Sequence, residues 1–172
     1  MGLIHIYAGD GKGKTTAAAG LCTRAAGNGM AVLFVQFMKG RPTGETESLK
    51  KLGVGILRNS RDYGFLKGMT PEDKNALYNE NTDNLKTAVK WAWEHENSLV
   101  VLDEIMVVYN NGLIDKEEVK DMVLHKPDSV ELVLTGRNPD EFFVENCDYY
   151  TEMMCRKHPF KAGIRARRGI EY

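Results

Sequence analysis

A glycine-rich segment near the N-terminus constrains this chain more than any other feature. Residues 8–16 read Ala-Gly-Asp-Gly-Lys-Gly-Lys-Thr-Thr and lie between an apolar run and an alanine-rich stretch. The spacing matches the phosphate-binding loop Gly-x-x-x-x-Gly-Lys-Ser/Thr, except that Ala8 replaces the first glycine. Alanine is small, so we expect the bend to survive. The segment predicts a strand, a phosphate loop and a helix in succession, as in α/β nucleotide-binding folds.

The residue types in this loop suit a bound phosphate group. Gly9, Gly11 and Gly13 allow the backbone to wrap closely and to turn its N–H groups inward. The helix expected to begin near Lys14 adds the positive end of its dipole. Lys14 also supplies a mobile positive charge, and the hydroxyl of Thr15 is a suitable Mg²⁺ ligand.

A second motif supports the first. Residues 99–104 read Leu-Val-Val-Leu-Asp-Glu, an apolar strand that ends in two carboxylates. This pattern is typical of the second motif of NTPases, in which an acid completes the ligand shell of Mg²⁺ (or Mn²⁺). The spacing leaves open which of Asp103 and Glu104 contacts the metal.

The rest of the chain alternates short apolar runs with longer helical patterns. Strands are predicted at 3–7, 31–37, 54–57, 98–102, 130–135 and 149–153, and helices at 14–28, from 70 onward, at 115–124 and at 139–146. Such alternation favours a parallel sheet with helices on both faces. The predicted fold class is therefore α/β, with the RecA-like fold of P-loop NTPases. A chain of 172 residues fits a single domain over 1–172.

The helix that begins near residue 70 has clear signals at its start. Thr70 is a suitable N-cap, and Pro71 fits the first helical position. Further along, four apolar residues follow helical spacing and are predicted to share one face: Leu85, Val89, Ala92 and Trp93.

Composition and charge exclude several classes of protein. Hydrophobic residues make up 42% and charged residues 27% of the chain, which argues against global disorder. A net charge of −1 gives no general attraction to nucleic acid or to an anionic membrane. No apolar run approaches the ~18–20 residues of a membrane span, and the N-terminus does not resemble a signal peptide. We therefore expect a cytoplasmic protein without a membrane partner.

Cysteine and histidine give no sign of a separate catalytic or metal site. Cys22, Cys147 and Cys155 are too few and too irregularly spaced for a disulfide framework or a zinc site. We expect them to be small buried thiols in a reducing compartment. The histidines are scattered, and no Ser–His pair stands out. The sequence also lacks the Asn-Lys-x-Asp segment that reads guanine, which argues against a GTPase.

Several segments in order along the chain resemble one enzyme family. They are residues 9–18, 35–40, 101–104, 134–137, 158–164 and 169–172. Together they resemble the ATP:corrinoid adenosyltransferases, in which asparagine usually stands at the position of Asp10. The resemblance implies transfer of the 5′-deoxyadenosyl group of ATP to the Co(I) centre of a reduced corrinoid, with release of triphosphate, in adenosylcobalamin biosynthesis or salvage. Since Co(I) is itself a strong nucleophile, the protein needs to supply position and charge rather than a general base.

The resemblance also implies roles for particular residues. ATP would lie in the loop in the reverse of the usual orientation, which exposes its 5′ carbon. Catalytic roles fall on Lys14, Thr15 and Glu104, and the Mg²⁺ (or Mn²⁺) ligands would come from Thr15, Asp103 and Glu104. The expected ATP-binding residues are Gly9, Asp10, Gly11, Lys12, Gly13, Lys14, Thr15, Thr16 and Arg137.

The corrinoid contact is expected at an aromatic residue. Family members commonly carry a Gly-Phe-Thr-Trp segment near the corrin, and here Gly64-Phe65-Leu66-Lys67 stands in its place. Phe65 is the expected corrinoid-binding residue, whereas Lys67 occupies the tryptophan position. The family further implies a flavoprotein reductant and a homodimer. We expect an open corrinoid site that a neighbouring subunit or the reductant protein completes.

A basic stretch near the C-terminus leaves three interpretations open. Residues 156–168 contain six lysines and arginines and no acid, within the segment 156–172 that we assign to the same domain. They could form a solvated face, contact ATP phosphates or the corrinoid, or bind nucleic acid. The last option belongs to the alternative function, a RecA-like ATPase acting on nucleic acid, with Glu104 positioning water. A nucleotide-binding regulatory module without turnover is the third class.

Overall fold

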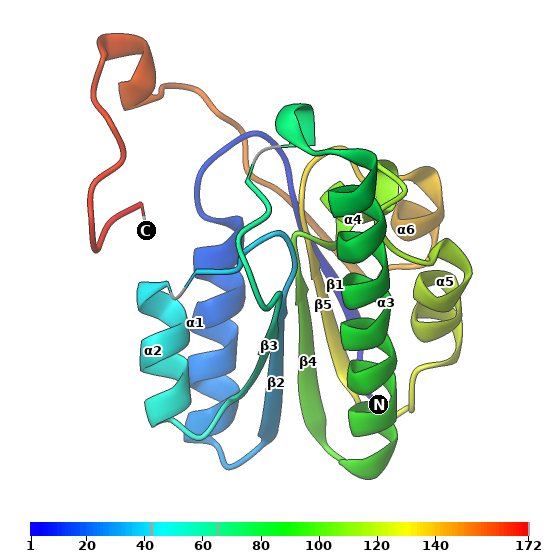
Figure 1. Cartoon of the computed structure of the whole chain (residues 1–172). Helices are drawn as coiled ribbons and strands as arrows, with labels where there is room; N and C mark the ends of the chain where they lie inside the picture. The colour runs from blue at the N-terminus through cyan, green and yellow to red at the C-terminus, as the bar shows by residue number, and fades with distance from the viewer. Residues whose placement is uncertain (42, 65, 172) are drawn as a thin grey trace.

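Six parallel strands form one sheet in the computed structural model, which describes residues 1–41, 43–64 and 66–171 (Figure 1). The strands are β1 (Ile4–Ala8), β2 (Ala31–Gln36), β3 (Gly55–Arg58), β4 (Ser98–Asp103), β5 (Glu131–Thr135) and β6 (Tyr149–Glu152). Their order is β3-β2-β4-β5-β1-β6, and every neighbouring pair is parallel. The α/β class predicted from the alternating pattern is confirmed.

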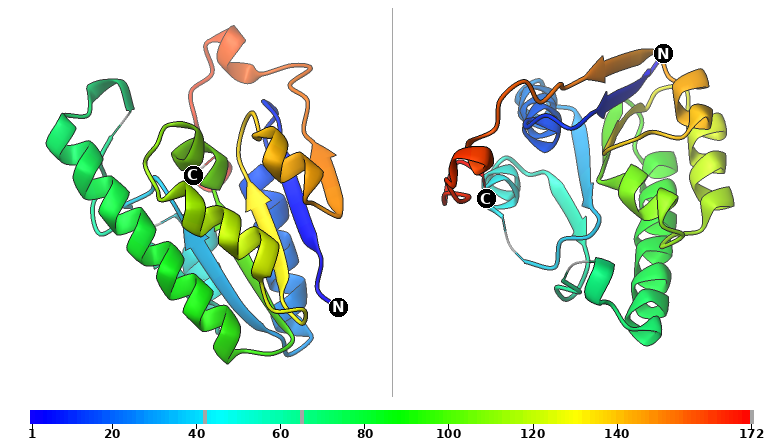
Figure 2. Two further views of the ribbon diagram at one scale, coloured as in Figure 1. Left: turned by 90° about the vertical axis from the view of Figure 1, so that its right-hand side faces the viewer. Right: turned by 90° about the horizontal axis from the view of Figure 1, so that it is seen from above.

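Helices cover both faces of the sheet (Figures 1 and 2). One face carries α1 (Lys14–Gly27) and α2 (Gly44–Lys51). The opposite face carries α3 (Pro71–Glu94), α4 (Ile105–Asn110), α5 (Lys116–His125) and α6 (Glu141–Glu145). Two short 3-10 turns, Leu66–Gly68 and Pro159–Ala162, complete the described elements.

The central strand β4 shows why the sheet has a core on each side. Leu99 and Val101 pack with α1 and α2, whereas Val100 and Leu102 pack with the helices of the opposite face. Successive side chains of a strand point to opposite faces, so a continuous apolar run buries both. All six residues of β4 are buried, including the terminal Asp103.

The long helix α3 confirms its predicted start and corrects one residue of its predicted face. Thr70 Oγ1 accepts a hydrogen bond from the Asp73 amide at 3.1 Å, and Pro71 is the first helical residue. Leu85 and Ala92 are buried, but Trp93 is 65% exposed. Trp93 lies about 100° around the helix from Ala92, because an α-helix has 3.6 residues per turn. That rotation takes the indole out of the core.

Two helices were not predicted. The helix α2 buries only Thr46 and Leu49, so its sequence carries little apolar periodicity. The helix α4 is a single short element whose apolar Ile-Met-Val-Val-Tyr run also suits a strand. Its start follows Glu104, whose φ of 62° turns the chain sharply out of β4.

The three thiols differ in exposure, which corrects the prediction that all are buried. Cys22, on the buried face of α1, is in the core, Cys147 is half-buried, and Cys155 is exposed. Cys155 follows the end of β6 and belongs to the C-terminal segment that leaves the sheet (Figure 1). None of the helices in the part of the chain that the structure describes has the length and apolar character needed to cross a bilayer.

The chain beyond β6 runs over the phosphate loop instead of packing against the sheet. Met153 donates its N–H to Ala8 O at 2.8 Å, and its carbonyl accepts from the Gly11 N–H at 2.6 Å. From there the segment 154–171 extends outward and returns beside α1 and α2 (Figures 1 and 2). Its last described residues pair with the loop again, through a 3.0 Å contact between Lys12 Nζ and Glu171 Oε1.

Candidate active site

The carboxyl ends of the strands meet at a pocket of about 510 Å³, the expected place for a ligand on such a sheet. The loop from Asp10 to Thr16 forms its floor, and Lys39, Glu45, Glu104 and Arg137 form its wall. His158 and the end of the C-terminal segment also line the pocket, the latter through Gly169, Ile170 and Glu171. The structure thus brings together most of the residues predicted for ATP binding.

Two of the predicted residues do not line the pocket. Gly9 lies at the back of the loop, where an added Cβ would come within 2.6 Å of Met153 O. Asp103 is fully buried beneath the pocket. The predicted corrinoid residue, Phe65, lies outside the described residues.

The loop conformation depends on glycine. Gly9 and Gly13 have φ angles of 106° and 117°, which L side chains rarely adopt. At Gly11 a Cβ would meet Met153 O at 2.5 Å, so only glycine allows the C-terminal segment to come this close. The Gly11 N–H is bonded to that same carbonyl and does not point into the pocket. Ala8, in place of the usual first glycine, is buried at the end of β1.

Lys14 reaches back across the loop. Its Nζ donates to Gly9 O at 2.7 Å and to Gly11 O at 2.9 Å, and the residue is only 8% exposed. Burial lowers the pKa of the Lys14 ammonium below its usual value, and the nearby charge of Arg137 adds to this shift. The ammonium is therefore held at the pocket floor by carbonyl oxygens that phosphate oxygens can replace.

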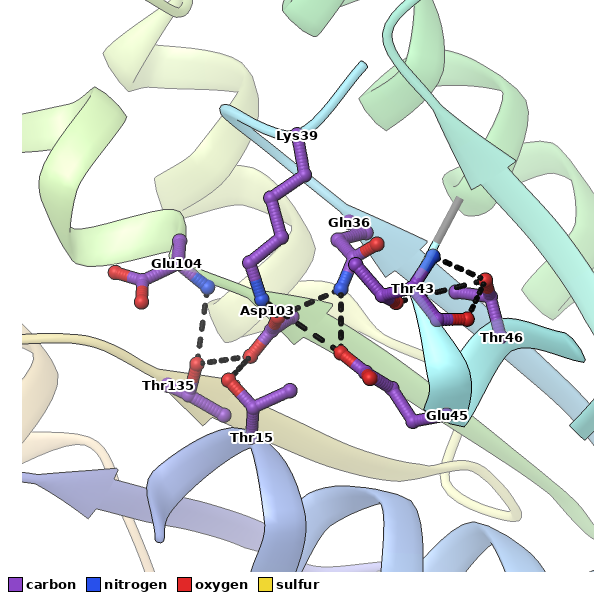
Figure 3. Close-up of polar contacts among 9 residues, drawn as sticks. All are labelled: Thr15, Gln36, Lys39, Thr43, Glu45, Thr46, Asp103, Glu104 and Thr135. Carbon is purple, nitrogen blue, oxygen red and sulfur yellow. Dashed lines mark hydrogen bonds and ion pairs between the residues drawn. The ribbon is translucent and has the colours of Figure 1, made fainter. Parts of the chain in front are cut away.

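Asp103 accepts hydrogen bonds on both carboxylate oxygens (Figure 3). Its Oδ1 accepts from Thr15 Oγ1 at 2.9 Å and from Thr135 Oγ1 at 2.7 Å. Its Oδ2 accepts from Gln36 Nε2 at 3.4 Å and from Lys39 Nζ at 3.3 Å. These four donors satisfy a carboxylate that is completely withdrawn from water.

Glu104 faces the pocket, and its side chain points away from Asp103 (Figure 3). Its backbone N–H donates to Thr135 Oγ1 at 2.9 Å, and the same hydroxyl donates to Asp103. Burial, and then the Asp103 charge, raise the pKa of the Glu104 carboxyl above its ordinary value. Thr135 therefore positions both acids of the second motif.

The oxygen atoms of Thr15 and Asp103 suit a hard divalent cation. Mg²⁺ prefers oxygen ligands and is commonly held by one or two side chains together with substrate phosphates. Within the described residues, no group of three or more His, Cys, Asp and Glu side chains could hold a metal ion unaided. Thr15 and Asp103 could therefore hold such a cation together with oxygen atoms from a bound ligand.

Four polar residues of the site were not singled out from the sequence: Gln36, Lys39, Glu45 and Thr135. The first two lie in the 35–40 segment and Thr135 lies in the 134–137 segment, both of which carried the family resemblance. Gln36 and Asp103 are register partners at the ends of β2 and β4. That pairing depends on strand order, which a single sequence does not reveal.

The basic C-terminal stretch is exposed along its described side chains, which include Arg156, Lys157, Arg165 and Arg168. This exposure favours a solvated face over a tightly packed contact. Arg167 pairs with Glu171 at 3.0 Å, so part of its charge is internally neutralised. The hydrogen bonds from Arg167 and the ammonium of Lys12 lower the pKa of the Glu171 carboxyl to about 2.

Comparison with known proteins bears directly on this site. Curated proteins named "Corrinoid adenosyltransferase" align with 99% of this chain. The protein from Sinorhizobium sp. is 36% identical, with 80% of its own length covered. Those from Pseudomonas aeruginosa and Escherichia coli K12 are both 32% identical, with 84% and 86% of their lengths covered.

A solved structure and a family model extend the comparison. The Aeropyrum pernix ORC2 protein (ADP form) aligns with a TM-score of 0.47 and 18% identity over 91% of this chain and 43% of its own, too distant to support any argument. The family model described as ATP:corrinoid adenosyltransferase BtuR/CobO/CobP matches residues 1–172, the whole chain. With this match, and with relatives above 30% identity that align with 99% of this chain, the chain belongs to the ATP:corrinoid adenosyltransferase family.

Proposed function

We propose that this corrinoid adenosyltransferase transfers the 5′-deoxyadenosyl group of ATP to the Co(I) centre of a reduced corrinoid and releases triphosphate. Family membership supports adenosylation of a corrinoid. The hydrogen bond from Thr15 to the buried Asp103 is the observation that supports the use of ATP as the adenosyl donor. It joins the phosphate loop to the acid at the end of β4. It provides one place for the phosphates and an associated cation.

In this reaction a Co–C bond forms and the bond between the 5′ carbon and the triphosphate oxygen breaks. The cobalt supplies the electron pair, and the departing triphosphate takes the pair from the broken bond. No proton needs to be removed from the nucleophile, so a general base is not required. The demand on the protein is to position ATP and to neutralise the growing charge on the leaving group.

The pocket supplies that neutralisation from several directions. Lys14 would exchange its carbonyl partners for phosphate oxygens, and Arg137 would contact the phosphates from the wall. Thr15 and Asp103 would hold Mg²⁺ or Mn²⁺, with Glu104 close by. A cation bound there would screen the negative charge of the triphosphate. ATP would lie in the reverse of the usual orientation, so that its 5′ carbon faces the corrinoid.

The partners and setting of the enzyme belong to the same proposal. We assign residues 1–172 to one adenosyltransferase domain in the cytoplasm, with a flavoprotein as the source of electrons for cobalt. A second copy of the chain, or that reductant, would complete the open corrinoid side. Phe65 is retained as the proposed corrinoid contact. The exposed Phe160 and Ile164 of the C-terminal segment support a partner at this end of the molecule.

Spectroscopy of the corrin tests this function. The protein is mixed with ATP, Mg²⁺ and chemically reduced cobalamin, and the corrin spectrum is followed. We expect conversion to adenosylcobalamin that Asp103→Asn reduces strongly, because the variant loses the buried charge. Conversion that requires no ATP, or that the variant leaves at the wild-type rate, would contradict the proposed site. ATP consumption that depends on DNA or RNA would instead favour a RecA-like ATPase.

A further inference from the structure

Lys39 lies between two carboxylates at the edge of the pocket (Figure 3). Its Nζ is 3.3 Å from Asp103 Oδ2 and 3.8 Å from Glu45 Oε1. The Asp103 side chain is fully buried, whereas the Lys39 and Glu45 side chains are 31% and 25% exposed. The only ion pair of Asp103 among the described residues is therefore made by a long side chain that also reaches solvent.

Gln36 fixes the two carboxylates relative to each other. Its Nε2 donates to Glu45 Oε1 at 3.3 Å and to Asp103 Oδ2 at 3.4 Å. Its Oε1 is buried without a hydrogen-bond partner among the described residues. A buried unpaired oxygen is unfavourable. The amide keeps this orientation because its nitrogen is bound to two negatively charged groups.

The position of Lys39 conflicts with a cation on Asp103. Thr15 and Asp103 Oδ1 are the oxygens that suit Mg²⁺, and the Lys39 ammonium contacts the other oxygen of the same carboxylate. A divalent ion there would lie close to the positive charge of Lys39, beside a fully buried carboxylate, and the two positive charges would repel each other. Lys39 and the metal therefore compete for the charge of Asp103.

We propose that Lys39 is a displaceable counter-ion, which neutralises Asp103 until the metal–nucleotide complex binds and then transfers its ammonium to the triphosphate. Glu45, already 3.8 Å from the ammonium, holds Lys39 near the pocket during this transfer. The buried Asp103 carboxylate thus always has a positive partner. A buried carboxylate without one would raise the free energy of the folded protein. This inference rests on the proposed ATP and metal site, and assigns Lys39 and Glu45 functions beyond it.

The proposal predicts effects of opposite sign for metal alone and for metal with triphosphate. Replacing Lys39 by methionine removes the competitor, so a metal ion without nucleotide should bind more tightly. The same replacement removes a phosphate contact, so the metal–triphosphate complex should bind more weakly. Damage to the fold would weaken both, and a purely structural lysine would give no such reversal.

Mn²⁺ titrations followed by electron paramagnetic resonance supply the test, with the full-length protein and inorganic triphosphate as the added anion. For Lys39→Met we expect Mn²⁺ alone to bind about tenfold more tightly than to wild type. With triphosphate present, we expect binding about tenfold weaker than wild type. Lys50→Met is the matched control, because Lys50 pairs with Glu47 on the exposed side of α2 and lies away from the pocket.

A second variant protects the test against misfolding. Lys39→Gln removes the charge but keeps a hydrogen-bond donor for Asp103, and it should show the same reversal to a smaller extent. If folded Lys39→Met and Lys39→Gln bound Mn²⁺ alone no more tightly than wild type, the proposal for Lys39 would be overturned. The proposed metal site would not be affected by that result. Absence of Mn²⁺ binding by wild type even with triphosphate would overturn the metal site and this inference together.

Discussion

The Thr15 hydroxyl donates a 2.9 Å hydrogen bond to Asp103 Oδ1, across 88 residues of sequence. This bond joins the phosphate loop to the end of β4, the two motifs on which the proposed chemistry depends. The Thr135 hydroxyl donates to the same oxygen at 2.7 Å and accepts a hydrogen bond from the Glu104 backbone N–H at 2.9 Å. The acid is thus oriented from two neighbouring elements before any ligand arrives.

Thr135→Val should weaken metal-dependent activity by about 10- to 100-fold, the usual effect of removing a partner that orients a metal ligand. Valine keeps the size of threonine but cannot bond Asp103 or the Glu104 amide. The rate of adenosylcobalamin formation at several Mg²⁺ concentrations measures the effect. Thr87→Val is the control, since Thr87 is exposed and its hydroxyl donates to Asp83 O within the same helix, α3. Equal activity in the two variants would refute a positioning role for Thr135.

Lys14→Ala should lose most ATP affinity. Hydrogen bonds to charged groups contribute about 1.5–3 kcal/mol, which corresponds to roughly 10- to 150-fold in the dissociation constant. Isothermal titration calorimetry with ATP and Mg²⁺ gives the value directly. Lys90→Ala serves for comparison, because that lysine is on the exposed side of α3. Unchanged ATP affinity in Lys14→Ala would show that the loop is not the nucleotide site.

Two glycine-to-alanine changes should shift stability in opposite directions. At Gly11 the added Cβ would lie 2.5 Å from Met153 O, and such overpacking costs about 1–3 kcal/mol. At Gly20, within α1, no atom lies within 4 Å of the added Cβ, and alanine should raise the free energy of unfolding by about 0.5–1 kcal/mol. Urea unfolding of both variants measures the difference. A stabilised Gly11→Ala would mean that the C-terminal segment does not lie against the loop.

The three thiols should react with a thiol reagent in a fixed order at pH 8. Cys155 is exposed and should react first. Burial raises the pKa of Cys147, which is half-buried, so it should react slowly. Burial raises the pKa of Cys22 to about 12, which leaves almost no thiolate at pH 8, so it should react only after unfolding. The thiol reagent is 5,5′-dithiobis(2-nitrobenzoate), and the time course of 2-nitro-5-thiobenzoate release from it measures this order.

Cys155→Ser provides the control for that experiment and should remove the fast phase alone. If the fast phase survived in this variant, the exposure assigned to the C-terminal segment would be wrong. Rapid reaction of all three thiols in the folded protein would likewise contradict the packing of α1.

Local signals accounted for much of the fold and for the centre of the site. The loop from Gly9 to Thr15 and the acids after β4 were found from spacing, because each is continuous in sequence and lies at a strand end. The cap at Thr70 was found for the same reason. Trp93 was misplaced because helical spacing has a broad tolerance, and a residue at the margin of the apolar face can lie outside the core.

The missing parts of the site depend on contacts between distant segments. Gln36 meets Asp103 only because β2 and β4 are neighbours in register, and Glu45 joins them from a helix with little periodicity. Glu171 reaches Lys12 across 159 residues. No local sequence pattern predicts these contacts. Gln36 and Lys39 do lie in the segment 35–40, one of those that resemble the adenosyltransferase family.

Analysis of the phosphorus products tests the central claim most directly. The protein is incubated with ATP, Mg²⁺ and chemically reduced cobalamin, and the products are followed by phosphorus nuclear magnetic resonance beside the corrin spectrum. The proposed function predicts one intact triphosphate for each adenosylcobalamin formed. ADP and orthophosphate as the primary products, formed without adenosylcobalamin, would contradict it.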